Sequence, residues 1–251
     1  MPVIFITGAT SGFGAATARL FARNGWKVVA TGRREERLAA LRAEFAEGVV
    51  HTAQVDLMDR QSIVAAVAGL PADFRPIHCL FNNGGLALGT RPIPDVDLDD
   101  WNTMIDTNIK GLIHTTMEVL PLLRAAGRGA SIVNMGSVAQ RWAYPGGNVY
   151  GGTKAFVHQF SHNLRTDLAG ADIRVTTLEP GLAKSEFTLV RTHGDEAANE
   201  ALYEGVEPLL PEDIADIVWF LATRPAHVNI ASLEVTPVMQ VAGASRVVRK
   251  N

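Results

Sequence analysis

The stretch TGATSGFG, residues 7–14, joins the apolar run VIFIT (3–7) to the helical pattern AATARLFARNG (15–25). Glycines at such a junction let the backbone turn tightly and approach a phosphate, while the N-terminus of the following helix presents free N–H groups to the negative charge. A plain tight turn also uses glycines, but the strand–loop–helix order favours a nucleotide site. The residues predicted to contact a dinucleotide here are Gly8, Thr10, Ser11, Gly12, Phe13 and Gly14.

Short β-branched runs alternate with helical patterns along the rest of the chain, which implies crossovers and a parallel sheet. The predicted strands cover residues 3–7, 27–32, 49–55, 77–82, 130–136, 173–179 and 231–237. The predicted helices cover residues 13–24, 34–46, 59–69, 99–126, 149–169 and 211–223.

The predicted strands are apolar on both faces, as expected when helices cover both sides of a sheet. The sequence therefore predicts an α/β fold in which residues 1–251 form a single doubly wound domain of about seven parallel strands. No linker long enough to separate two domains interrupts the pattern. A polar insertion around residues 182–210 follows the sixth strand, and it is interpreted either as a mobile lid over a cleft or as an ordinary surface excursion.

Composition excludes several classes of protein. The 251 residues carry 23 Lys and Arg against 26 Asp and Glu, so the net charge of −3 gives no sign of a nucleic-acid surface. The N-terminus has no basic leader and no apolar run reaches membrane-spanning length, so neither a signal peptide nor a membrane partner is expected. The single cysteine, Cys79, lies in an apolar run and fits a reducing, cytoplasmic setting.

The end of the second strand predicts which dinucleotide binds. Sites that select NAD usually carry an acid here to accept from the ribose 2′-hydroxyl, whereas this chain has Gly32 followed by Arg33 and Arg34. Two guanidiniums favour a 2′-phosphate and therefore NADP(H). The alternative is that both arginines begin a solvated helix with surface ion pairs, although basic residues at a helix N-terminus oppose the macrodipole.

Polar residues also follow the third and fourth strands, at the sheet edge where open α/β sheets bind ligands. Asp56 is predicted near an adenine ring, although it is equally suited to cap the next helix. Asn82 is able to hydrogen-bond its own turn. The predicted cofactor contacts at this edge are Asp56, Leu57, Asn83, Gly84 and Gly85.

The stretch NVYGGTKAF, residues 148–156, places Tyr150 and Lys154 one helical turn apart on one helix face. A nearby ammonium favours the phenolate, so Lys154 is expected to lower the pKa of Tyr150 and make it a proton donor and acceptor. Ser137 follows the fifth strand at the same sheet edge and is expected to hold a substrate carbonyl against Tyr150. Asn108 is either part of this set or a satisfied buried amide.

With these motifs in order, the chain resembles the short-chain dehydrogenases/reductases over nearly its whole length. The resemblance implies a Rossmann-type sheet, reversible hydride transfer to or from a nicotinamide, and a homotetramer built from the helices at 99–126 and 149–169. It also implies a catalytic set of Asn108, Ser137, Tyr150 and Lys154, in which Asn108 fixes a water of the proton relay and Lys154 also binds the nicotinamide ribose.

Two positions depart from the pattern of that family. Gly84 stands where the family usually has alanine, which adds backbone freedom beside the cofactor. The usual threonine after Pro180 and Gly181 is missing, and Ser185 is the candidate to replace it. The cofactor contacts implied in this stretch are Pro180, Gly181, Leu182 and Ser185.

Within the family, several stretches are similar to NADP-dependent 3-hydroxy acid and serine dehydrogenases, and EFTLVRTHGDEAANEALYEG (186–205) is similar to sulfoacetaldehyde reductases. Both groups handle short anionic substrates. The expected reaction therefore interconverts a short anionic hydroxy compound and its aldehyde or ketone. A guanidinium grips a carboxylate or sulfonate through two hydrogen bonds, so Arg141 and Arg191 are candidate anchors, with Trp142 and Tyr144 as pocket walls.

Three competing interpretations are weaker. His158 and His162 have zinc-binding spacing but lack a third ligand, so no metal site is expected. Ser137 lacks the GxSxG elbow of a hydrolase. A non-catalytic NADP-binding regulator remains an alternative, although such a protein would be expected to lose Tyr150 or Lys154 first. For the C-terminal stretch 237–251, packing on another subunit and a free tail both stay open.

Overall fold

The structure is a computed structural model, which describes residues 1–241 of the chain. Its centre is a seven-stranded sheet in the order β3-β2-β1-β4-β5-β6-β7, with every pair of neighbours parallel. The strands are β1 (Val3–Ile6), β2 (Lys27–Gly32), β3 (Val50–Gln54), β4 (Cys79–Asn82), β5 (Ser131–Met135), β6 (Arg174–Pro180) and β7 (Ser232–Val235). This order reverses between β1 and β4, which confirms the predicted Rossmann-type fold.

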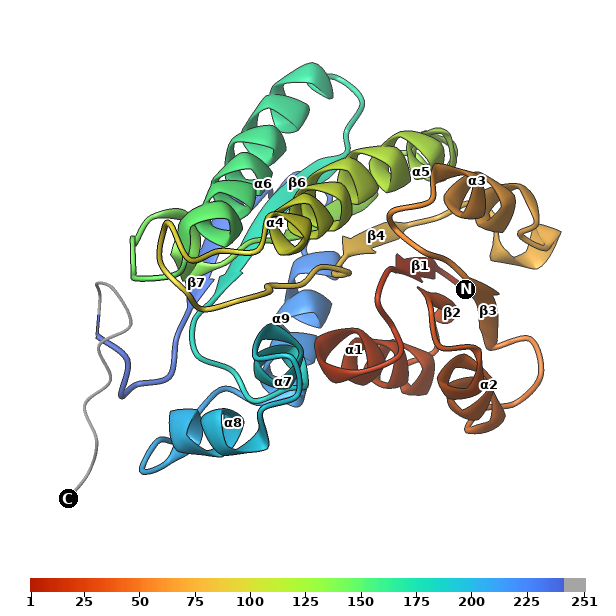
Figure 1. The fold of residues 1–251 in the computed structure, drawn as a ribbon. Coiled ribbons are helices and arrows are strands. Elements are labelled where there is room, and N and C mark those ends of the chain that lie inside the picture. The colour runs from red at the N-terminus through yellow and green to blue at the C-terminus, as the bar shows by residue number, and fades with distance from the viewer. Residues whose placement is uncertain (242–251) are drawn as a thin grey trace.

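Helices cover both faces of the sheet (Figure 1). One layer holds α1 (Gly12–Arg23), α2 (Glu35–Ala43) and α9 (Pro211–Ala222). The other holds α3 (Arg60–Ala68), α4 (Leu98–Ile105), α5 (Leu112–Ala126) and α6 (Asn148–Asp167). Two 3-10 turns, η1 (Ala72–Phe74) and η3 (Val138–Gln140), lie in the connections.

Side chains of β1 alternate between two buried apolar clusters. Ile4 and Ile6 pack in the cluster that includes Phe21 of α1, whereas Val3 and Phe5 pack in the cluster that includes Val119 of α5. All four β1 side chains are at most 1% exposed. Burial on both faces explains why the strand is apolar throughout rather than at every second residue.

The helix predicted over residues 99–126 is interrupted. A π-helical turn, η2 (Asp106–Gly111), separates α4 from α5. Single π-turns inside helices are rare and occur often at functional sites, and this one contains Asn108. An apolar periodicity cannot reveal such a turn, because the helix continues in the same direction on both sides of it.

The polar insertion at 182–210 has secondary structure of its own, namely α7 (Phe187–Arg191) and α8 (Glu196–Tyr203). It leaves the carboxyl end of β6, and in Figure 1 α7 lies close to α1. The position of this segment beside the glycine loop matters for the site described below.

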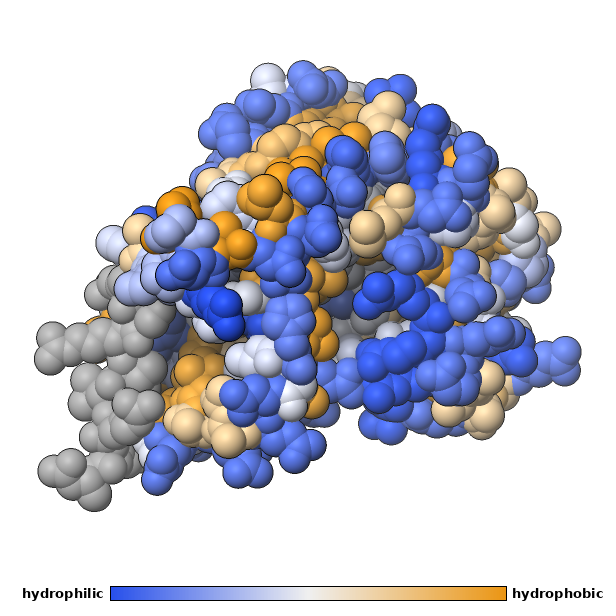
Figure 2. Space-filling model, viewed as in Figure 1, coloured by the Kyte–Doolittle hydropathy of each residue, from blue (hydrophilic) through white to orange (hydrophobic). Residues whose placement is uncertain are grey.

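The outer surface of the α5 and α6 layer carries a stripe of apolar side chains (Figure 2). Met117 of α5 is 58% exposed, and the rings of Phe156 and Phe160 on α6 stack at 5.6 Å between centroids. Within residues 1–241, no helix is both long and apolar enough to span a membrane. The C-terminal prediction falls largely on residues 242–251, which lie outside the described residues.

Candidate active site

A pocket of about 500 Å³ opens at the carboxyl ends of β1, β2, β4, β5 and β6. It gathers nearly all of the residues predicted from the sequence, and the exceptions are Gly14, Asn108 and Arg141. The predicted residues that line it are Gly8, Thr10, Ser11, Gly12, Phe13, Arg33, Arg34, Asp56, Leu57, Asn83, Gly84, Gly85, Ser137, Trp142, Tyr144, Tyr150, Lys154, Pro180, Gly181, Leu182, Ser185 and Arg191.

The glycine loop is held in a conformation that only glycine adopts easily. Gly8 and Gly12 have φ values of 68° and 50°. Gly14 is a helical residue, and a Cβ there would collide with the carbonyl oxygen of Gly8. Gly14 therefore lets α1 start directly against the loop, although it does not face the pocket itself. Asn83 fixes the loop from β4, because its Nδ2 donates to the carbonyl of Thr7 at 2.9 Å.

The end of β2 has room and charge for a phosphate rather than for an acid. A Cβ built on Gly32 would lie 2.6 Å from Cγ2 of Thr10, so a carboxylate side chain cannot occupy this position unless Thr10 moves. Arg34 donates from Nη2 to the hydroxyls of Thr10 and Ser11 at 3.1 and 2.8 Å. Arg33 is exposed and lines the same pocket. These cations and hydroxyls fit a 2′-phosphate.

Glycine at position 84 has a steric explanation in addition to its backbone freedom. A Cβ at this position would lie 2.6 Å from Cδ1 of Leu57 and 3.2 Å from Oγ1 of Thr7. The Gly84 N–H already donates to that Oγ1 at 2.9 Å. The departure from the family alanine is therefore matched to the leucine at position 57.

The structure decides between the alternatives left open for Asp56, as a cap of α3, and for Asn82, as a partner of its own turn. Asp56 does not cap α3, because Asp59 does so by accepting from Gln61 N; Asp56 Oδ1 instead accepts from Met58 N at 3.0 Å. Asn82 is 3% exposed and donates to Thr116 and Asn134 inside the protein, so it does not hydrogen-bond its own turn.

Ser137, Tyr150 and Lys154 meet at the base of the pocket. Tyr150 and Lys154 lie on α6 with 8% and 5% exposure, and Ser137 precedes η3. The Ser137 side chain hydrogen-bonds to Tyr150. Lys154 Nζ donates to the Met135 carbonyl at 2.7 Å and lies 5.8 Å from the centroid of the Tyr150 ring.

The expectation that Lys154 lowers the pKa of Tyr150 is wrong for this structure. Burial raises the pKa of the Tyr150 phenol, and the hydrogen bond from Ser137 and the charge of Arg191 oppose this shift only in part. Burial also lowers the pKa of Lys154 from 10.5 to about 8. Tyr150 is therefore a neutral phenol at neutral pH, which is the form that donates a proton.

Asn108 lies behind the pocket rather than in it. Its Oδ1 accepts from Leu86 N at 2.9 Å, and its Nδ2 donates to the Leu86 carbonyl at 2.8 Å and to Thr153 Oγ1 at 3.1 Å. The side chain is thus a satisfied buried amide, 2% exposed, that ties the loop after β4 to α6. Its contacts fix the helix turn that carries Tyr150 and Lys154.

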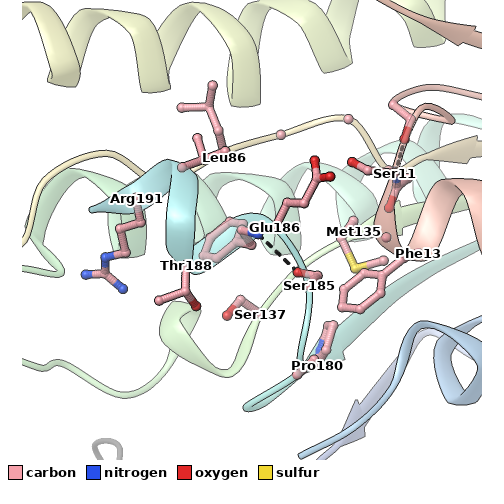
Figure 3. Close-up of a pocket in the computed structure, with 18 of the residues that line it drawn as sticks. Ser11, Phe13, Leu86, Met135, Ser137, Pro180, Ser185, Glu186, Thr188 and Arg191 are labelled. Carbon is pink, nitrogen blue, oxygen red and sulfur yellow. Dashed lines mark hydrogen bonds between the residues drawn. The ribbon is translucent and has the colours of Figure 1, made fainter. Parts of the chain in front are cut away.

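The open end of the pocket carries one of the two predicted arginines. The Arg191 guanidinium lies 5.1 Å from the ring centroid of Tyr144 and 6.0 Å from that of Tyr150. Figure 3 shows Ser185, Glu186, Thr188 and Arg191 on one side of the pocket, with Ser11 and Phe13 on another. Trp142 also lines the pocket and is 39% exposed.

Arg141 does not reach the pocket, contrary to the sequence-based prediction. Its Nη2 lies 3.0 Å from Glu179 Oε2 and its Nη1 lies 3.4 Å from Glu234 Oε2. Glu179 is fully buried on β6, so its charge requires a cation, and Arg141 is held there together with His158. His158 is thus paired with a carboxylate, and no cluster that could bind a metal occurs in residues 1–241.

Several residues of the pocket, and Arg37 beside it, were not predicted from the sequence. Glu186 pairs with Arg34 at 2.8 Å and with Arg37 at 2.6 Å. Arg37 lies one helical turn after Arg34, so its spacing was a usable signal; Glu186 gave none, because it is separated from both arginines by about 150 residues. The further unpredicted lining residues include Leu86, Thr107, Met135, Phe187, Thr188 and Gln240.

Comparisons with known proteins agree with this geometry. The family model described as short chain dehydrogenase matches residues 2–195. Sulfoacetaldehyde reductase 2 of Chromohalobacter salexigens is 55% identical over 98% of both chains, and serine 3-dehydrogenase of Rhizobium radiobacter is 52% identical over 99% of this chain and 98% of its own. An NADP-dependent 3-hydroxy acid dehydrogenase of Salmonella typhi is 54% identical over 95% of this chain and 96% of its own.

Solved structures give the same result. The closed form of a serine dehydrogenase complexed with NADP+ has a TM-score of 0.93 and 48% identity, covering 99% of this chain and all of its own. The serine dehydrogenase from Escherichia coli has a TM-score of 0.83 and 45% identity over 95% of this chain and 99% of its own. By sequence, fold and site geometry, the chain belongs to the short-chain dehydrogenase family.

Proposed function

We propose that this chain is an NADP(H)-dependent oxidoreductase that interconverts a short anionic hydroxy compound and its aldehyde or ketone. The observation that carries this proposal is the position of Arg191. Its guanidinium lies beside Tyr150 in the pocket and forms no ion pair with a carboxylate of the described residues. An anionic substrate provides the missing charge within reach of the tyrosine that transfers the proton.

The cofactor part of the proposal rests on the β2 end. A side chain at Gly32 would collide with Cγ2 of Thr10, so an acid there requires Thr10 to move, and Arg33 and Arg34 supply the positive charge for a 2′-phosphate. The pyrophosphate would lie on the glycine loop at the N-terminus of α1. When bound, the nicotinamide supplies or accepts the hydride.

The chain itself handles the proton and the substrate oxygen. The Ser137 hydroxyl hydrogen-bonds the carbonyl oxygen and orients it toward Tyr150. In the reducing direction Tyr150 would give its proton to that oxygen while the carbonyl carbon gains a C–H bond from the hydride that NADPH would supply. Lys154 keeps a positive charge near the phenolate that results, and Asn108 positions the helix turn that carries both residues.

Two substrate classes compete within this proposal. Serine-type or 3-hydroxy acid dehydrogenation is supported by the similarity to the serine dehydrogenase with NADP+. Reduction of sulfoacetaldehyde is supported by the relative of that name, at 55% identity over 98% of the chain. Both substrates place an anion close to a reacting carbon, as the separation between Arg191 and Tyr150 requires.

The test compares Arg191→Ala and Arg191→Lys with the wild type. The substrates are malonate semialdehyde, serine and sulfoacetaldehyde, with propanal as an uncharged control. We expect Arg191→Ala to raise KM for the anionic substrates by about 10–100-fold, as loss of a charge-assisted pair implies, and to leave propanal within about twofold. Equal effects on charged and uncharged aldehydes would exclude Arg191 as the anion anchor.

We also propose an oligomeric state and a location for the protein. The apolar stripe on the α5 and α6 layer, with Met117 at 58% exposure, is consistent with a homotetramer that buries this surface. The free, fully buried Cys79 is consistent with a cytoplasmic enzyme. Light scattering at several protein concentrations tests the tetramer.

A further inference from the structure

Glu186 joins the 182–210 segment to the arginines at the end of β2. Its Oε2 accepts from Arg34 Nη1 at 2.8 Å and its Oε1 accepts from Arg37 Nη1 at 2.6 Å. Burial alone would raise the pKa of this carboxyl, but hydrogen bonds from both arginines outweigh it and hold the pKa below its usual value. The two oxygens therefore bridge two cations as a charged carboxylate, much as a phosphate would.

One of these two cations, Arg34, belongs to the proposed 2′-phosphate site. Arg34 donates hydrogen bonds from Nε to Thr10 Oγ1, from Nη2 to the hydroxyls of Thr10 and Ser11, and from Nη1 to the Glu186 carboxylate. An arginine has five N–H donors, and these contacts occupy most of them. A 2′-phosphate brings a charge of about −1.5 to −2 and several strong acceptor oxygens into this space. The phosphate and Glu186 carry like charges and need the same donors of Arg34.

The segment that carries Glu186 lies over the mouth of the cleft. The neighbouring residue Ser185 faces the glycine loop, because a Cβ added to Gly12 would lie 3.4 Å from Cβ of Ser185, at van der Waals distance. Figure 3 shows the Glu186 carboxylate extending from this segment toward Ser11. A cofactor whose pyrophosphate lies on the glycine loop must pass this point, so the contact of Glu186 with the arginines bears on its entry.

We infer that Glu186 is a specificity-determining residue, whose carboxylate binds Arg34 in the absence of cofactor and competes with the 2′-phosphate of NADP(H) for that arginine. This inference rests on the proposed phosphate site. It extends that site to a residue of the 182–210 segment. NADP(H) must displace this carboxylate from Arg34, which lowers its affinity, whereas NAD(H) has no phosphate that competes with Glu186.

The binding test uses adenosine 2′-monophosphate as the probe and adenosine 5′-monophosphate as its control, by isothermal titration calorimetry. In Glu186→Gln the competing charge is gone, so we expect the Kd of the 2′-phosphate to fall by about two- to fivefold, the range for loss of an exposed ion pair. The Kd of the 5′-phosphate should stay within error. The matched control is Glu200→Gln, which removes an exposed acid from α8 of the same segment and should change neither Kd.

The second readout is hydrogen exchange in peptides that cover α7 and α8. In the wild type, saturation with adenosine 2′-monophosphate should raise the exchange rates, because the phosphate displaces Glu186. In Glu186→Gln the rates should be high from the start and should not respond to the probe. Unchanged exchange in the wild type on saturation, or a weaker or unaltered Kd for the 2′-phosphate in Glu186→Gln, would overturn the inference.

The phosphate site itself is tested apart from Glu186. If the wild type binds the 2′- and 5′-monophosphates equally and Arg33→Ala weakens neither, the proposed site is wrong. If the wild type prefers the 2′-monophosphate and Arg33→Ala removes the preference, the site stands whatever the result for Glu186→Gln. The two failures are therefore distinguishable.

Discussion

Two regions meet at the pocket and are built in different ways. The proposed catalytic cluster, Asn108, Ser137, Tyr150 and Lys154, is at most 9% exposed and is fixed by hydrogen bonds to β5, α6 and the loop after β4. The 182–210 segment exposes Val190 and Leu202 by 43% and 38%, and besides the packing of Phe187 on Tyr150 its contacts with the rest of the protein include ion pairs of exposed side chains. In the proposed function, proton transfer therefore depends on fixed positions, whereas selection of cofactor and substrate depends on a segment with more exposed contacts.

Two tyrosines, one in each region, give the largest expected contrast. In Tyr150→Phe the proton donor is lost while the ring still packs against Phe187, 5.6 Å away between centroids. We expect kcat to fall by about 10²–10⁴-fold, the usual contribution of general acid catalysis, with NADPH affinity within about twofold. Steady-state kinetics and NADPH fluorescence titration measure both.

The matched variant is Tyr203→Phe in α8. The Tyr203 hydroxyl donates to the Ala183 carbonyl at 2.9 Å and contacts Thr188 Oγ1 at 3.0 Å, so it organises the segment from within. Its loss should raise KM by a few-fold and leave kcat nearly unchanged. A Tyr150→Phe enzyme as fast as the wild type would show that the proton comes from another group.

Two lysines repeat the contrast through pH. Burial lowers the pKa of Lys154 from 10.5 to about 8, so its ammonium is present below pH 8 and is lost as pH rises above it. If the phenolate that forms needs this charge, kcat in the reducing direction should fall by about tenfold per pH unit above 8. Profiles from pH 6 to 10 at saturating substrate measure the fall.

The exposed lysine of the 182–210 segment, Lys184, is the control. Lys184→Gln should keep the wild-type profile, because its side chain is solvated and does not line the pocket. A wild-type kcat that stays flat through pH 8 to 10 would mean that Lys154 keeps its proton or that its charge is not required.

The same division separates what the sequence could predict from what it could not. The glycine loop and the pair Tyr150 and Lys154 are local patterns, in which strand, turn and helix spacing alone place the groups. The arginines needed long-range information. Arg141 is only four residues from Ser137, yet it forms an ion pair with the buried Glu179 on β6 and so does not reach the pocket. No residue near Arg141 in the sequence indicates this partner.

Two further features were equally hidden from the sequence. The π-turn at Asn108 leaves the apolar pattern of the helix intact, so its periodicity gives no signal. Burial reversed the expected pKa shift of Tyr150, since the desolvation of a side chain depends on the whole fold rather than on its neighbours along the helix.

The smallest expected effect concerns the far margin of the segment, where His193 Nε2 lies 3.0 Å from Asp100 Oδ2. His193 is 59% exposed in its side chain, so the pair is worth at most about fivefold in an equilibrium constant. Asp100→Asn should raise KM for the anionic substrate within that factor and leave kcat unchanged.

The control is Asp73→Asn in η1, which breaks the ion pair of Asp73 with Lys27 and should change neither constant. A fall in kcat with KM unchanged in Asp100→Asn would mean that the segment also positions the proposed catalytic cluster, because a more loosely held segment alone changes substrate binding and not the rate at which the bound complex reacts.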